Sequence, residues 1–100
     1  MMNKELQYKN FMRSLEHPDP PESCTPCLKA LWYDKNENWS KAHQIAQEIS
    51  TKDGFRIHAY LHRKEGDRSN AAYWYSRAGR TIPQISLSEE WESMVGYFLK

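Results

Sequence analysis

The chain has 100 residues, of which 39% are hydrophobic and 13% aromatic, a composition that supports one folded domain and argues against disorder. A formal net charge of +1 excludes a dominant electrostatic attraction to nucleic acid, and no stretch approaches the roughly 18 apolar residues of a membrane span. We therefore expect a single domain over residues 1–100 that binds neither nucleic acid nor membrane. Because no apolar leader precedes a cleavage site, we expect it to be cytoplasmic.

The first half of the chain predicts three helices. Apolar residues recur at helical spacing in residues 4–15, and the proline-rich stretch HPDPPESCTP that follows cannot be helical throughout. Residues 1–22 are therefore expected to form an N-terminal helix and its connector. Two further helical patterns, at residues 26–35 and 39–50, predict a first hairpin over residues 25–50.

The second half predicts three more helices. Gly66 can adopt the positive φ that ends a helix, and Asp67 can cap the helix that follows. Helices at residues 55–65 and 68–78 then form a second hairpin over residues 54–79, after the segment TKDG has broken the helix before it. Ser86 and Glu89 have the spacing of a capping box, which starts a C-terminal helix over residues 86–99. We predict an all-α fold.

The turn glycine and the residues after it resemble the second half of a tetratricopeptide repeat. The resemblance rests on Gly66, Asp67, Ala71, Tyr75, Ala78 and Pro83. A weaker copy, NWSKAHQIAQEIS, lies 29 residues upstream. The segment HAYLHRKEGDRSNAAYWYSRAG also resembles a family of small uncharacterised bacterial proteins with fungal relatives, which has no established activity to transfer. The resemblance to the repeat implies antiparallel helical hairpins whose open ends are covered by the two terminal helices.

A basic and aromatic face on the fourth predicted helix suggests a function. Its residues are Arg56, Tyr60, Arg63 and Lys64. The resemblance places them in the concave groove where tetratricopeptide domains hold extended peptides, and Arg and Tyr are frequent binding hot spots. We predict a non-enzymatic protein interaction module, without a cofactor, whose partner is an acidic peptide segment. Two repeats are few for a stable array, so we also expect a homodimer. The alternative is a solvated face.

The histidines favour a different function, a small-molecule or metal site, including a catalytic one. His58 and His62 are four residues apart, so on a helix both imidazoles share a face and can reach one ion. The residues that could complete such a pocket are His43, His58, His62, Glu65 and Tyr75. A third interpretation makes His58 and His62 neutral core residues that pack between helices.

Two cysteines form the sequence Cys24-Thr-Pro-Cys27. In a cytoplasmic protein such a pair indicates redox or metal chemistry. Together with His58 and His62 it would supply the four ligands of a structural zinc site. Against redox chemistry, no predicted strand precedes the pair as in a thioredoxin. The alternative is two small, partly buried residues at the start of a helix.

Overall fold

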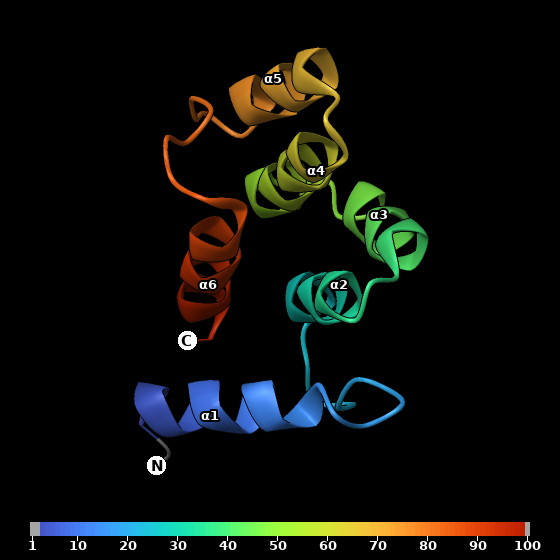
Figure 1. The fold of residues 1–100 in the computed structure, drawn as a ribbon, viewed down its shortest axis with the longest axis vertical. Helices are drawn as coiled ribbons and strands as arrows, with labels where there is room; N and C mark the ends of the chain where they lie inside the picture. Colours follow the sequence, from blue (N-terminus) through green and yellow to red (C-terminus); the bar gives the residue numbers. More distant parts are fainter. Residues whose placement is uncertain (1–2, 100) are drawn as a thin grey trace.

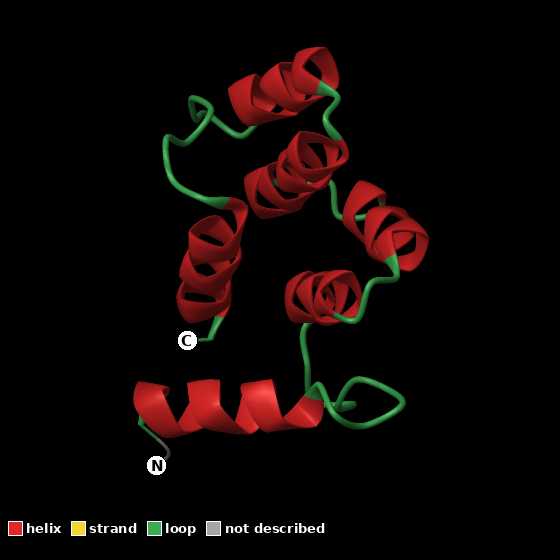
Figure 2. Cartoon of the chain, viewed as in Figure 1, coloured by secondary structure: helices red, strands yellow, loops and turns green. Residues whose placement is uncertain are grey.

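The computed structural model describes residues 3–99, which fold into six helices (Figure 1). In chain order they are α1 (Lys4–Ser14), α2 (Pro26–Lys35), α3 (Trp39–Gln47), α4 (Lys52–Glu65), α5 (Arg68–Arg77) and α6 (Leu87–Phe98). No strand occurs in residues 3–99 (Figure 2), and the predicted all-α class is confirmed. Within the same range, no helix combines the length and the apolar character needed to cross a membrane.

In the run of four consecutive helices from α2 to α5, neighbours in the chain pack against each other. The contacts run from α2 to α3, from α3 to α4 and from α4 to α5. Helix α6 then returns to α2 and α4, and α1 touches α6 (Figure 1). Helix α4 consequently has neighbours on several sides, and its polar side chains must find partners inside the fold.

The helix ends follow the capping residues that the sequence predicts. Gly66 ends α4 with φ of 89°, and the Asp67 carboxylate accepts a hydrogen bond from Asn70 N–H at 3.2 Å. Asn38 caps α3 in the same way, through Lys41 N–H at 3.2 Å. The capping box at the start of α6 is complete. Local polar chemistry therefore sets most boundaries of the helices.

The junction between α3 and α4 differs from the prediction. Helix α3 ends at Gln47 rather than at residue 50, and α4 begins at Lys52 rather than at residue 55. The segment TKDG starts a helix, because the Thr51 hydroxyl accepts a hydrogen bond from Gly54 N–H at 3.4 Å. A side chain at position 54 would place its Cβ 2.0 Å from the carbonyl oxygen of Ile49. The glycine thus permits close contact here instead of breaking a helix.

The core has two parts on either side of α4. The larger cluster joins all of the helices except α5 and includes Trp91, which is 1% exposed and donates its indole N–H to the Leu31 carbonyl at 3.0 Å. The smaller cluster, between α4 and α5, contains Ala59, Ala71 and Tyr75. Burial on both sides holds α4 in a fixed orientation, and α4 supplies most of the residues considered below.

Candidate metal centre

Three histidines from α3 and α4 meet through their ring nitrogens. The Nε2 atoms of His43 and His58 are 3.0 Å apart, and those of His58 and His62 are 3.1 Å apart. One ligand nitrogen from each of the three rings lies within 4.8 Å of the others. His58 and His62 are buried, whereas His43 is half-buried. The cluster is therefore buried at the two histidines of α4 and partly exposed to solvent at His43.

Hydrogen bonding alone does not satisfy this cluster. A ring nitrogen offers either one proton or one lone pair, yet Nε2 of His58 lies close to two other Nε2 atoms. It can form a good hydrogen bond with one of them at a time. A cation that accepts all three lone pairs would satisfy the three rings together. In tetrahedral coordination, metal–nitrogen distances of about 2.0–2.1 Å place two ligand nitrogens about 3.3 Å apart. The distances observed between the rings are close to this spacing.

Glu65 orients one of the rings from behind. Nδ1 of His62 lies 2.7 Å from Oε1 of Glu65, so Nδ1–H donates to the carboxylate. This hydrogen bond leaves the lone pair of His62 on Nε2, which faces His58. Metal-binding histidines commonly donate their second ring N–H to a carboxylate, which fixes the tautomer and increases the basicity of the ligand. Glu65 therefore has the position of an outer-shell partner.

Two tryptophans enclose the imidazoles. The Trp39 indole stacks on His43 with ring centroids 4.8 Å apart, and Trp74 stacks on His58 at 4.1 Å. Trp39 is itself fixed, because its indole N–H donates to the Leu61 carbonyl at 2.9 Å. These contacts hold the ring planes before any ion binds. The stacking of Trp39 on His43 was not predicted, although the two residues are four apart and so share a helix face.

Burial keeps two of the imidazoles neutral. Burial, together with the neighbouring His43 and His62, lowers the pKa of His58 to about 4. The pKa of His43 is also lowered, first by burial and then by His62, while Glu65 acts in the opposite direction. The neutral imidazole is the form that binds a metal ion. At neutral pH, His43 and His58 therefore need not lose a proton before they can bind a metal ion.

Tyr75 and the cysteines lie apart from the histidines. The Tyr75 hydroxyl is 2.8 Å and 2.7 Å from the two carboxylate oxygens of Glu90 on α6. Cys24 and Cys27 are free thiols that pack against the larger core cluster, and among residues 3–99 no group of three potential metal ligands includes either. Burial, and secondarily Asp53, raises the pKa of Cys27 to about 11. This pKa disfavours the thiolate that redox or zinc chemistry needs.

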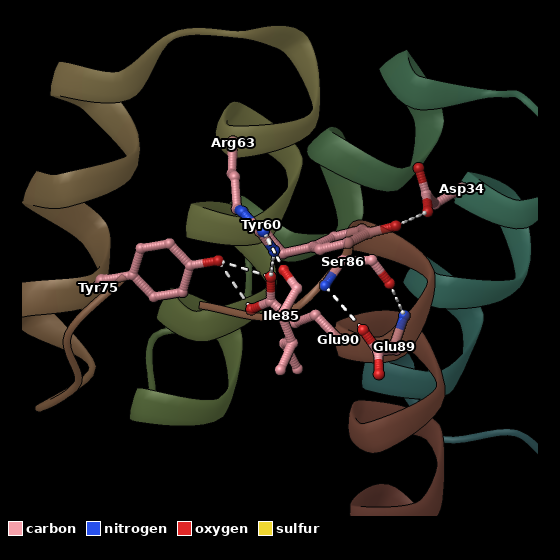
Figure 3. A network of polar contacts seen from close by, with 8 residues as sticks. All are labelled: Asp34, Tyr60, Arg63, Tyr75, Ile85, Ser86, Glu89 and Glu90. Carbon is pink, nitrogen blue, oxygen red and sulfur yellow. Dashed lines mark hydrogen bonds and ion pairs between the residues drawn. The ribbon is translucent and has the colours of Figure 1, made fainter. Parts of the chain in front are cut away.

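The predicted groove residues contact other helices of the same chain. The Tyr60 hydroxyl donates to Asp34 at 2.9 Å, and Lys64 forms an ion pair with the same carboxylate at 2.9 Å. Arg63 pairs with Glu90 at 2.7 Å and also donates to the carbonyl oxygen of Ile85 (Figure 3). The side chain of Arg56 is buried. Helix α6 therefore meets this face at Arg63 through Glu90, whereas α2 meets it at Tyr60 and Lys64 through Asp34.

Comparisons with known proteins identify no family for this chain, because no family model, no curated protein and no solved structure matches it. The function is therefore argued from the geometry of the chain itself.

Proposed function

We propose that the protein binds a divalent transition-metal ion through His43, His58 and His62. The convergence of three Nε2 atoms at distances of 3.0 Å and 3.1 Å carries this proposal. Imidazole donors suit zinc, copper and nickel, whereas calcium and magnesium prefer oxygen ligands. Three protein ligands leave a fourth position of a tetrahedral ion for water, on the side where His43 is open to solvent.

The proposed ion would have a structural effect as well as a chemical one. His43 belongs to α3, and the other two ligands belong to α4. An ion shared between them joins the two helices, and Trp74 connects the site to α5 through its contact with His58. Any ligand that binds the folded state and not the unfolded chain raises the free energy of unfolding. We therefore expect binding to stabilise the α3–α4–α5 part of the domain.

The test is a calorimetric titration of chelator-treated protein with zinc. We expect one equivalent to bind, and His58→Ala to weaken binding by about a hundredfold or more, because it removes the central ligand. Glu65→Ala should weaken binding about tenfold, as is typical of an outer-shell carboxylate. Cobalt in place of zinc should give the intense visible absorption of a tetrahedral complex.

His17→Ala is the matched control, because His17 is exposed and lies outside the cluster. It should bind zinc like the wild type. Zinc binding that is equally strong in the His58→Ala protein would overturn the proposal, as would binding that depends on His17.

We keep a tetratricopeptide-like, peptide-binding module as a second proposal, for one reason. Between α2, α4 and α6 the surface has a hollow of about 300 Å³, which two of the predicted groove residues, Tyr60 and Lys64, line together with Trp91. An acidic peptide labelled with a fluorophore should bind the wild type, and Lys64→Ala should weaken its anisotropy signal. Lys41→Ala, at an exposed lysine on α3, is the control. If Lys64→Ala and Lys41→Ala bind the peptide equally well, this surface is not the peptide-binding site.

A further inference from the structure

Arg56 is a buried cation that forms no ion pair among residues 3–99. It is 8% exposed, and its Nε–H is inaccessible and has no hydrogen-bond partner. Within residues 3–99 the ion pairs join other cations to carboxylates, and none includes Arg56. Its guanidinium lies 5.9 Å from the centre of the Tyr97 ring. A buried charge without a partner costs free energy, so the position calls for an anion.

Two further cations lie at the same corner of the fold. Lys52 precedes Arg56 by one helical turn and therefore shares its face of α4. Nζ of Lys52 is 3.8 Å from the place where a Cβ on Gly79 would stand. Gly79 has φ of 74° and directly precedes Arg80, so Arg80 follows the point at which the chain passes Lys52.

The balance of charge at this corner is positive. Burial lowers the pKa of Arg56, and Arg80 is the charge that lowers it most after burial. Two carboxylates, Glu90 and Asp53, act on Arg56 in the opposite direction. Glu90 is already engaged by Tyr75 and Arg63. Of these two carboxylates, Asp53 is therefore the one that forms no ion pair among residues 3–99.

We propose that Lys52, Arg56 and Arg80 bind a phosphate group, either inorganic phosphate or a phosphomonoester. The planar guanidinium of Arg56 can donate hydrogen bonds to phosphate oxygens from its terminal nitrogens, and the adjoining Nε–H, which has no partner, reports on the same guanidinium. Lys52 and Arg80 then balance a dianion, which suits this corner better than a singly charged carboxylate does. The site is independent of the histidines, because Arg56 and His58 are two residues apart and point to different sides of α4.

The Nε–H resonance of Arg56 provides a direct test. In nitrogen–proton NMR spectra, this signal should shift saturably when sodium phosphate is added, and should not move when sodium chloride is added at matched ionic strength. Arg80→Gln should weaken phosphate binding by about tenfold, the effect of one charge-assisted hydrogen bond. Arg13→Gln, at an exposed residue of α1, removes the same charge and should leave the affinity unchanged.

Glycerol 2-phosphate distinguishes the two sources of the group. Tighter binding than inorganic phosphate supports an ester ligand, and weaker binding supports the free ion. Arg56→Gln should abolish the effect. If that variant fails to fold, Lys52→Gln and Arg80→Gln replace it as tests, because both side chains are exposed and each substitution should weaken phosphate binding. A shift that does not saturate, that chloride reproduces, or that the Arg80→Gln protein retains in full overturns the proposal.

Discussion

Replacement of Glu90 by alanine is expected to lower the free energy of unfolding by about 3–5 kcal/mol, the range for breaking a buried ion pair. Glu90 is 1% exposed. Its carboxylate pairs with Arg63 and accepts a hydrogen bond from the Tyr75 hydroxyl, so α6 is joined to both α4 and α5 (Figure 3). Burial and then the hydrogen bond to Glu90 raise the pKa of Tyr75, which keeps the hydroxyl a neutral donor. Alanine would leave the buried Tyr75 hydroxyl without its acceptor, and it would leave Arg63 with only the Ile85 carbonyl.

Urea denaturation followed by circular dichroism at 222 nm measures this loss. A domain of this size has a total stability of about 5–15 kcal/mol, so the variant should lose a large share of it. Its midpoint of thermal unfolding should fall by about 4–8 °C for each kcal/mol. Glu92→Ala is the matched control on the same helix, because Glu92 is exposed and should matter by less than about 0.5 kcal/mol. Equal losses in the two variants would contradict the role of Glu90.

The wild-type protein is also expected to lose stability as the pH falls from about 6.5 toward 4. The pKa of His58 is about 4 in the folded state, below the value of about 6.5 in an unfolded chain. The unfolded chain therefore takes up the proton first, and the stabilising contribution present above pH 6.5 decreases until the folded pKa is reached. One group with this shift accounts for about 3 kcal/mol. His43, whose pKa is also lowered, acts in the same direction.

His58→Leu separates this effect from the titration of carboxylates in the same range. The variant should be tolerated at neutral pH, because leucine replaces a buried polar group, and its stability should depend less on pH between 6.5 and 4.5. The observable is the difference between wild type and variant in urea midpoint at each pH. His17→Leu, at an exposed histidine, should leave the wild-type profile unchanged. A wild-type profile parallel to that of His58→Leu would show that His58 is not held neutral by burial.

Local patterns in the sequence were enough to predict the helices and much of the histidine cluster. Six helices, the turn at Gly66 and the capping box at Ser86 all depend on residues within a few positions of each other. The same holds for His58 and His62, which four-residue spacing places on one face. The approach of His43 was considered as one alternative, and it follows from the packing of α3 on α4.

The periodic spacing of apolar residues does not predict contacts between segments that lie far apart in the chain. Tyr60 meets Asp34 from 26 residues away, and Arg63 meets Glu90 from 27 residues away. Each partner taken alone looks like an ordinary charged or polar residue of a helix surface. Their pairing depends on where α6 packs, and a single sequence contains no local signal for that. The sequence therefore predicts a free groove on the basic face and gives no sign that Arg63 pairs with Glu90 of α6.

The missing side chain at Gly54 determines how closely the ligand-bearing helices approach. A methyl group there would need the space of the Ile49 backbone, which comes just after α3. Any larger residue would push α3 outward and carry His43 with it, while His58, one turn beyond Gly54 on α4, would stay in place. The spacing between the proposed ligands is thus set by a residue with no ligand atom. In the proposed metal site, a substitution at Gly54 would therefore change which ion is preferred while the three imidazoles stay the same.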